Sequence, residues 1–585
     1  MLSPFVDCRA KRDARQRIIA CLGVRRPFPH MKNISFEAGD HIDARDFGVV
    51  LDGQTDNTGA LQNALDACGD RGGGVVRLPA GLCAIGGHVT VPNDVTLEGV
   101  ATSPRRWMPG RGATLLAYEG RGEEDGAPFI ALCANAVLKG LAVHYPEQSG
   151  SEVAPYPWCV EGGEGGDAAV IDCLLVNPYQ GIHMGRHMTN RHLISRVFGS
   201  PLRRGILVDR VVDIGRIDTV HFWPFYPESM GNPVFRSFVQ SHGEAFIFGR
   251  TDWQHVLNTF CWGYCVGYHF IEGDSGVCNG NFIGLGADAC NVSVWVENSA
   301  PYGLLISNGE FVAIFGENPV QICVDQSNNG TVQFNNCAFW GLSDQCAHVA
   351  GDGFVSFNQC HFLDWRSQLE SKACVEAETG QIAVNGCRFG KAGEAIRIGK
   401  EVKGAVIAAN MFSGENAVVL EEGAHAAVTG NLVAKPRYAT PEDSFIVDIR
   451  GQDVALEGFW PNQSNRSAFH GHYYFTRGGR IPSSCRWNFP PHAQGPHTLS
   501  VWIPDQRGHH ADETTYVIHT PQGDSEVRLR QRDFKGQWAP LGVFDITPDS
   551  YVTLSVASSG IVLADALMGT RVPRGAMASC GPDCA

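Results

Sequence analysis

The chain has 585 residues, of which 61 are Asp or Glu and 46 are Lys or Arg, and its formal net charge at pH 7 is −15. This negative balance argues against nucleic acid as a partner. Because no run of 18 apolar residues occurs, a membrane-spanning helix is also excluded. The length is sufficient for two or more domains.

Residues 1–38 are expected to form an N-terminal extension. The extension is basic, with Arg9, Lys11, Arg12 and Arg15, and no apolar stretch of the kind found in signal peptides is visible in it. The location of the protein therefore stays open between secreted or periplasmic and cytoplasmic.

The first patterned segment, residues 42–99, contains one predicted helix that begins near Asp56. Its apolar residues follow the i, i+3, i+4, i+7 spacing of a single buried face: Leu61, Ala64, Leu65 and Cys68. The phrase D-F-G-x3-D-G-x-T-D-N-T that starts at Asp46, followed by G-G-G-x-V-x-L-P-x-G at 72–81, resembles the N-terminal cap of the pectate lyase superfamily, a group related to glycoside hydrolase family 28. The resemblance implies a right-handed parallel β-helix whose open end is closed by the helix. Because the superfamily contains lyases, hydrolases, epimerases and tailspikes, it does not imply one reaction.

A short phrase that ends in Phe recurs between residues 258 and 412. The Phe residues are separated by 22 to 29 positions: Phe260, Phe282, Phe311, Phe339, Phe362, Phe389 and Phe412. A period of this length is typical of a stacked solenoid. Since side chains alternate along a strand, each Phe and the residue two before it share the inner face, and the residue between them points outward. We therefore predict an all-β fold in which residues 39–450 form the parallel β-helix.

The 20 Cys residues are scattered through these strand-like phrases and form no convincing set of four metal ligands. The nearest arrangement is Cys261 and Cys265, which lack a second pair. We interpret the cysteines as small apolar side chains inside the coil. No cofactor is expected, with Ca²⁺ left open.

Residues 455–575 change to strands with alternating apolar residues. The phrases G-x-W-x-x-L-G-x-F at 536–544 and V-x-A-D-A at 562–566 are similar to golvesin-type C-terminal domains, which implies a β-sandwich. Its role stays open between glycan binding and a structural contact with the coil.

The window between Arg250 and Arg366 contains no Lys or Arg, although it contains eleven carboxylates and many aromatic residues. Two carboxylates can share the work of glycoside hydrolysis, and aromatic rings can stack on sugar faces. The predicted catalytic residues are Glu310, Asp288 and Asp252. Glu310 occupies the outward position of its phrase, where Asn281 and Ala338 are expected on the adjacent strands.

Residues expected to bind the substrate are the exposed-type aromatic and polar side chains of the same part of the chain: Trp253, Trp262, Asn281, Trp295, Trp340 and His221. Asp288 is expected in a Gly-rich bend close to Glu310. No residue set is predicted to bind a metal.

A lyase acting on uronates needs a cation to neutralise the substrate carboxylate, and this window supplies none. We therefore predict a glycoside hydrolase, or a glycosyl-transferring enzyme, that acts on a neutral poly- or oligosaccharide. A polysaccharide lyase of uronate polymers and a non-catalytic, tailspike-like glycan-binding protein remain as alternatives. The coil does not contain the polygalacturonase signatures N-T-D, D-D, G-H-G and R-I-K in that order, so no catalytic residue is assigned from them. The partner is a carbohydrate, with neither nucleic acid nor membrane expected, and homo-oligomer formation is left open.

Overall fold

The computed structural model describes residues 41–100, 111–148, 151–163, 165–223, 232–341, 343–365, 372–434, 443–451, 453–478, 482–508, 510–556 and 560–572. The predicted extension at residues 1–38 lies outside these ranges. Within them no helix is both long and apolar enough to cross a membrane.

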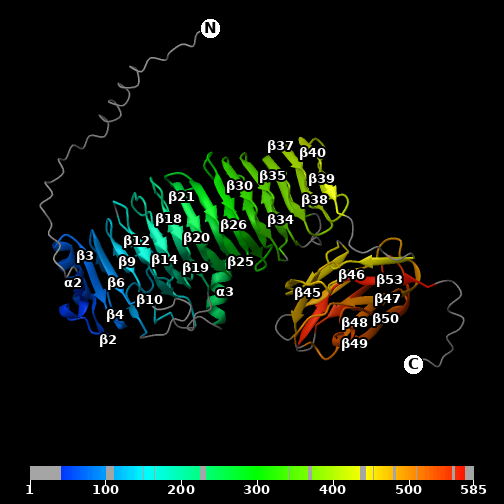
Figure 1. Cartoon of the computed structure of the whole chain (residues 1–585), viewed down its shortest axis with the longest axis horizontal. Coiled ribbons are helices and arrows are strands. Elements are labelled where there is room, and N and C mark those ends of the chain that lie inside the picture. The colour runs from blue at the N-terminus through cyan, green and yellow to red at the C-terminus, as the bar shows by residue number, and fades with distance from the viewer. Residues whose placement is uncertain are drawn as a thin grey trace, which may run out of the picture. The chain divides into compact units, whose positions relative to one another are not determined.

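A single helix covers the start of the coil (Figure 1). This helix, α2 (Thr58–Asp70), buries Leu61, Ala64, Leu65 and Cys68, which confirms the predicted face. Its first turn is capped by Asp56, whose Oδ1 accepts hydrogen bonds from the Thr58 N–H at 3.0 Å and the Thr58 hydroxyl at 2.6 Å. The helix packs on β3 (Gly74–Leu78) and β5 (Val89–Val91), so it protects the end of the sheet from solvent.

The body of the chain is a right-handed parallel β-helix, as predicted. In the middle of the coil three strands make one turn, and a strand pairs in parallel with the strand three places further along, as β21 does with β24 and β22 with β25 (Figure 1). In the described residues the first two strands of a coil belong to a 26-stranded sheet and the third belongs to a 15-stranded sheet. Four successive coils carry the residues discussed below: β20 (Glu244–Phe248), β21 (Thr251–Leu257) and β22 (Phe260–Trp262); β23 (Val266–Phe270), β24 (Cys278–Ile283) and β25 (Gly286–Cys290); β26 (Val292–Val296), β27 (Leu304–Ser307) and β28 (Glu310–Ala313); β29 (Val320–Val324), β30 (Thr331–Asn335) and β31 (Ala338–Phe339).

A sharp bend separates the second strand of each coil from the third. The bend residue has left-handed backbone geometry, with φ of 52° at Asn258, 69° at Gly284, 55° at Asn308 and 52° at Asn336. Asn and Gly adopt this conformation at lower cost than other residues. Because the bend changes the direction of the chain, residues close together on either side of it face different directions.

Phe side chains stack inside the coil, as the repeat predicts. The rings of Phe311, Phe339, Phe362 and Phe389 follow one another with centroids 5.5, 4.7 and 4.7 Å apart. Cys337, Cys360 and Cys387 are likewise buried free thiols, in agreement with their interpretation as core residues.

The first two Phe residues of the predicted ladder do not belong to it. Phe282 lies in β24 of the larger sheet, in register with Ile306. Phe260 occupies an outward position of the smaller sheet, in register with Gly286. The inner position of its strand is filled by Cys261 instead. The prediction was wrong here because period-two alternation gives the face within a strand but does not identify which strand of the coil is present.

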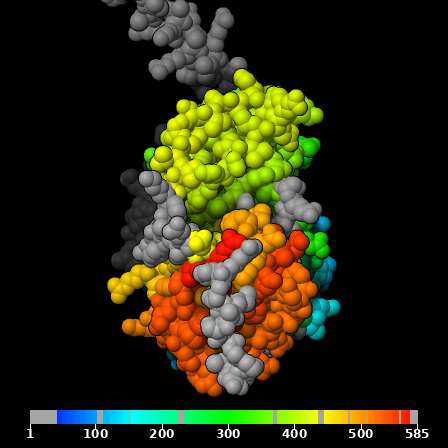
Figure 2. Space-filling view, turned by 90° about the vertical axis from the view of Figure 1, so that its right-hand side faces the viewer, coloured from blue at the N-terminus to red at the C-terminus, as the bar shows by residue number. Residues whose placement is uncertain are grey.

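The C-terminal part is an antiparallel β-structure with its own apolar core. Its strands form sheets of four, five and three strands: β42 (Ser444–Val447), β43 (Val454–Glu457), β44 (Asn462–Ser464), β45 (His472–Arg477), β46 (Ser484–Asn488), β47 (Gly495–Ile503), β48 (Thr514–Thr520), β49 (Gly523–Leu529), β50 (Gln537–Ile546), β51 (Tyr551–Ser555), β52 (Ile561–Ala564) and β53 (Leu567–Arg571). Figure 2 shows these residues, yellow to red, as a closely packed body. Trp487 and Tyr516 are among its fully buried side chains.

Candidate active site

Two rows of outward side chains run across the third strands of the coils. The first row joins Phe260, Gly286, Glu310 and Ala338, which are in register on β22, β25, β28 and β31. Ala338 therefore lies beside Glu310 as predicted. The second predicted neighbour, Asn281, does not lie in this row, because it belongs to the other sheet, and Gly286 takes its place.

The second row contains Asp288, which is in register with Trp262 on β22. Asp288 lies within strand β25 and not in a bend, which corrects the prediction. The register to β28 shifts at this point, so that Asp288 and Ala289 lie opposite the single residue Val312. Ala289 has φ of 57°, which marks a β-bulge. Bulges of this kind change the direction of a side chain relative to the regular ladder.

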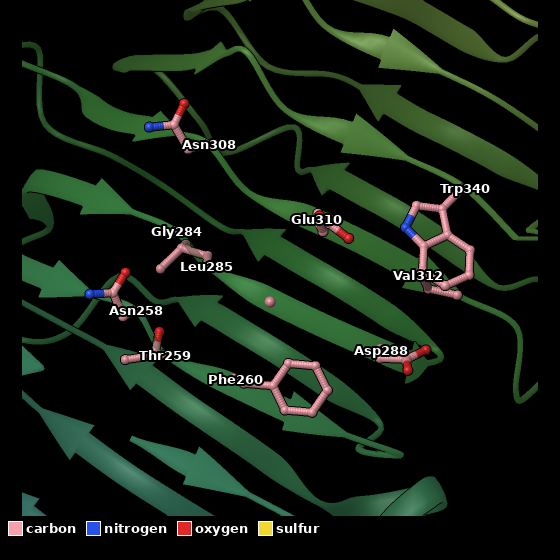
Figure 3. Close-up of a pocket in the computed structure, with 11 residues that line it drawn as sticks. Asn258, Thr259, Phe260, Gly284, Leu285, Asp288, Asn308, Glu310, Val312 and Trp340 are labelled. Atoms are coloured by element: carbon pink, nitrogen blue, oxygen red, sulfur yellow. The ribbon is translucent and has the colours of Figure 1, made fainter. Parts of the chain in front are cut away.

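Glu310 and Asp288 come together in one pocket of about 380 Å³ (Figure 3). Figure 3 shows the two carboxylates on neighbouring strands, with the rings of Phe260 and Trp340 on either side. The lining consists of apolar, amide and acidic residues: Asn258, Thr259, Phe260, Gly284, Leu285, Gly286, Asp288, Asn308, Glu310, Val312 and Trp340. None of these lining residues is Lys, Arg or His.

The environments of the two carboxylates differ. Asp288 is half-buried among Trp262, Val312 and Trp340, and this burial raises the pKa of its carboxyl group. Glu310 is exposed and stands between Gly286 and Ala338, which have little or no side chain. One acid is therefore biased toward its neutral form while the other faces solvent, an asymmetry that acid–base catalysis requires.

Gly286 keeps the floor of this pocket open. A Cβ atom placed on it would approach Cδ2 of the Phe260 ring to 2.7 Å. We expect Gly286→Val to fill the floor and displace the ring, which raises KM by about tenfold or more, while kcat changes less. The free energy of unfolding should fall by about 1–3 kcal/mol, because Gly286 is half-buried and the Phe260 ring has to move.

Steady-state kinetics and a thermal melt check this expectation. Ala338→Val is the matched control, since it adds the same kind of side chain on the other side of Glu310 and away from Phe260. Equal KM values for wild type and Gly286→Val would show that the floor of the pocket does not contact substrate.

Four of the predicted residues lie on other faces of the coil: Asp252, Trp253, Asn281 and Trp295. Asp252, Trp253 and Asn281 line a second pocket formed by β21, β24 and β27. Trp295 faces outward from β26, where it stacks on His269 with ring centroids 4.5 Å apart and its Nε1–H donates to Asp325 at 3.0 Å. The predicted single site is therefore divided, because the bend at each coil separates these residues.

Two further predicted residues lie beside the pocket without lining it. His221 continues the first row, three strands before Glu310, and stacks on Trp223 with ring centroids 5.5 Å apart. Trp262 neighbours Asp288 and makes an edge contact with Phe315. Phe260 and Asn308 line the pocket but were not among the predicted residues. The signal that could have found Phe260 is Asn258, whose position two residues earlier marks the bend.

Among the residues that the structure describes, no basic side chain lines the pocket. Arg191 and Arg203, which precede the cation-free window, form ion pairs with Asp167 at 2.6 Å and Glu244 at 2.7 Å. At the other end of the first row, Arg388 lies three strands beyond Glu310, or about 14 Å away along the sheet.

A network of charged side chains on the first strands of the coils was missed by the sequence reasoning. His269 hydrogen-bonds Glu244 at 3.0 Å and Glu297 at 3.1 Å, and Arg203 also donates to Glu244 at 2.7 Å. Burial alone would raise the pKa of Glu244, but the bonds from His269 and Arg203 outweigh it and lower this pKa to about 2. Because both ring nitrogens of His269 have partners, the network holds three adjacent strands together.

The lowered pKa predicts a dependence of stability on pH. A carboxyl group with a depressed folded-state pKa stabilises the fold above its unfolded pKa of about 4.3, and the effect is lost as pH falls toward 2. We expect Glu244→Gln to lower the free energy of unfolding by about 2–3 kcal/mol at pH 7 and by much less near pH 2.5. Guanidinium titrations at both pH values, with the exposed Glu401→Gln as control, measure the difference. If the difference in free energy of unfolding between wild type and Glu244→Gln were the same at both pH values, the lowered pKa of Glu244 would be contradicted.

Comparison with known proteins finds one family model and several solved structures that are similar to parts of the chain. Residues 445–571 match the Golvesin C-terminal domain. No curated protein matches the chain. Among solved structures, the A-module of the mannuronan C-5 epimerase AlgE4 from Azotobacter vinelandii is 13% identical with a TM-score of 0.43, and the match covers 67% of this chain and 100% of that one.

Two other solved structures have a similar fold. A tailspike protein of E. coli bacteriophage HK620, in complex with a pentasaccharide, is 9% identical with a TM-score of 0.43 over 91% of this chain and 93% of that one. A GH87 α-1,3-glucanase from Streptomyces thermodiastaticus is 13% identical with a TM-score of 0.34 over 69% of this chain and 70% of that one. These likenesses concern the fold alone. The parallel β-helix is established by the strand pairing, and residues 445–571 are similar to the Golvesin C-terminal domain.

Proposed function

We propose that the pocket on β22, β25 and β28 hydrolyses glycosidic bonds of a neutral poly- or oligosaccharide, with Asp288 as general acid and Glu310 as general base. The observation that carries this proposal is the pairing of the two carboxylates, one half-buried and one exposed, in a single pocket between Phe260 and Trp340. The proposal concerns this site and the class of reaction, not a particular sugar.

The difference in burial supports the assignment of roles. A general acid must carry a proton when the substrate binds, and burial raises the pKa of Asp288 in that direction. It would donate this proton to the oxygen of the leaving sugar. Glu310, which faces solvent, would accept a proton from water as the water attacks the anomeric carbon. Cleavage creates one new reducing end and leaves Asp288 without its proton and Glu310 with one, and proton exchange with solvent restores both groups before the next turnover.

The spacing of the two residues favours inversion at the anomeric carbon. Gly286 on β25 is in register with Glu310 on the next strand, and Asp288 lies two residues beyond Gly286. With about 4.8 Å between strands and about 3.3 Å per residue along a strand, the Cα atoms of Asp288 and Glu310 are about 8 Å apart. Inverting enzymes have carboxyl groups about 6.5–9.5 Å apart, which leaves room for the water, whereas retaining enzymes have them about 5–5.5 Å apart. Cα atoms at this spacing allow the wider separation of the carboxyl groups, and the proposal therefore gives Glu310 the role of general base.

The composition of the lining favours a neutral sugar. Trp340 and Phe260 offer faces on which a sugar ring can stack, and Asn258 and Asn308 offer amide groups at the rim. A uronate would bring its own negative charge next to the acidic side chains of Asp288 and Glu310, with no cation of the lining to neutralise it. The same reasoning disfavours the elimination reaction of a lyase.

Analysis of reaction products on a panel of glycans tests the proposal. The panel contains neutral polymers (dextran, laminarin, xyloglucan and galactomannan) and uronate polymers (polygalacturonate and alginate). We expect new reducing ends from at least one neutral polymer, without the absorbance of an unsaturated uronate. Formation of that chromophore would mean a lyase. Binding to a polymer without either product would mean a glycan-binding protein, and both results overturn the proposal.

A further inference from the structure

A second bulge lies one face away from the proposed active site. In β21 the register to β24 shifts between Thr251 and Gln254, so that Asp252 and Trp253 lie opposite the single residue Asn279. Trp253 has a φ of 57°, a backbone conformation that is rare for a residue with a large side chain. Trp253 is also 59% exposed to solvent. The bulge therefore presents a large aromatic ring to solvent where a regular strand would not.

Asn279 stabilises this strained segment. Its Oδ1 accepts a hydrogen bond from the Trp253 N–H at 3.0 Å, and its Nδ2 donates to the Thr251 carbonyl oxygen at 3.3 Å. One side chain thus bridges both ends of the bulge. Strained residues that are held in place by specific contacts occur mainly at functional sites, since strain without a role is costly.

The exposed ring lines a pocket of about 390 Å³ on β21, β24 and β27. Its lining combines two exposed aromatic residues with acid, amide and apolar groups: Asp252, Trp253, Asn279, Gly280, Asn281, Tyr302, Gly303 and Leu305. Tyr302 is 81% exposed, which is unusual for so large a ring. No Lys or Arg belongs to the lining.

We propose that this pocket is a second carbohydrate-binding site, which holds a neutral polysaccharide through the faces of Trp253 and Tyr302 while another part of the same molecule occupies the active site. The choice of a glycan as ligand rests on the proposed function, because the two pockets share the same pattern of two rings, acid and asparagine without cations. Two exposed rings with amide groups beside them suit the apolar faces and hydroxyl groups of sugars.

The two pockets lie on the same three coils. Strands β21, β24 and β27 carry the second pocket, and β22, β25 and β28, which follow them after the bend, carry the first. Seven residue steps lead from Trp253 to Phe260, so the Cα atoms of these two lining residues are at most about 25 Å apart. A polymer bound at the second pocket would raise the effective concentration of its neighbouring sugars at the first, whereas a short oligosaccharide would not reach both.

Affinity electrophoresis in gels that contain each polymer of the panel tests this inference. The parent protein carries Glu310→Gln, so that binding is measured without turnover and independently of whether hydrolysis occurs. We expect Trp253→Ala to weaken binding of a neutral polymer about tenfold and Trp253→Phe, which keeps a ring, to restore most of it. Leu432→Ala, which shortens a 62% exposed side chain at a distant coil, is the control and should bind as the parent does.

Kinetics of the otherwise unchanged enzyme give the second readout. Trp253→Ala should raise KM for the polymer about tenfold, whereas Leu432→Ala should keep the KM of the wild-type enzyme. Equal retardation of the parent and Trp253→Ala, or no retardation of the parent by any polymer, overturns the inference. Recruitment of a protein partner that depends on Trp253, without polymer binding, would overturn it as well. Failure of hydrolysis alone bears on the proposed function, because the gel assay does not depend on it.

Discussion

Asp288→Asn is expected to lower kcat/KM for a neutral glycan by about 10³-fold or more, because the variant cannot give a proton to the leaving sugar. The loss should be much smaller for an aryl glycoside whose leaving group needs no proton. The alkaline side of the pH–rate profile should also disappear. Burial raises the pKa of Asp288, so the wild-type enzyme loses activity as pH rises through this pKa, and the amide has no proton to lose.

Two comparisons separate this role from a structural one. Glu310→Gln should lose activity on the glycan and on the aryl glycoside alike, since both reactions need an activated water. Asp352→Asn is the matched control, because Asp352 is exposed and pairs only with Lys403, at 2.8 Å. An Asp288→Asn variant that loses activity equally on both substrates would contradict the role of general acid.

Phe339→Ala is expected to lower the free energy of unfolding by about 3–5 kcal/mol. The ring is completely buried and is stacked between Phe311 at 5.5 Å and Phe362 at 4.7 Å, so its removal leaves a cavity at the contact of three coils. In a solenoid each coil contacts mainly its neighbours, and the loss should therefore be largest near β31.

Guanidinium unfolding measures the total change, and hydrogen exchange of backbone amides locates it. Phe459→Ala is the control, since this residue is 40% exposed and should change stability by less than about 1 kcal/mol. A change of less than 1 kcal/mol in Phe339→Ala, or one spread evenly over all amides, would contradict the ladder as a source of stability.

The fold could be predicted from the sequence because its signals are repeated. The helix face that contains Leu61 and Leu65 follows from spacing, and the Phe residues from 311 onward follow from the period of the coil. The misplacement of Phe260 and Phe282 shows the limit of this reasoning. Alternation distinguishes inner from outer positions, but several strands of the coil share the same alternation, and Phe rings also occur inside the larger sheet at Phe334.

The candidate site could be predicted only in part. Glu310, Asp288 and Trp340 line one pocket as expected, but Asp252 and Trp253 lie on another face because the left-handed bend at Asn258 separates them. The two bulges had no sequence signal that we could recognise. They depend on contacts between coils, such as the bridge from Asn279 to Trp253, which join residues 26 positions apart. Burial of Asp288 likewise arises from neighbours on adjacent strands.

The most direct test of the proposed activity is the rate of reducing-end release from a neutral glycan by the double variant Asp288→Asn, Glu310→Gln. Its folding is compared with wild type by circular dichroism and thermal melting, and Glu401→Gln is assayed in parallel. We predict that the wild-type enzyme and Glu401→Gln release reducing ends at similar rates while the folded double variant releases none above the uncatalysed reaction. Release by the double variant at the wild-type rate would mean that the chemistry takes place elsewhere on the coil.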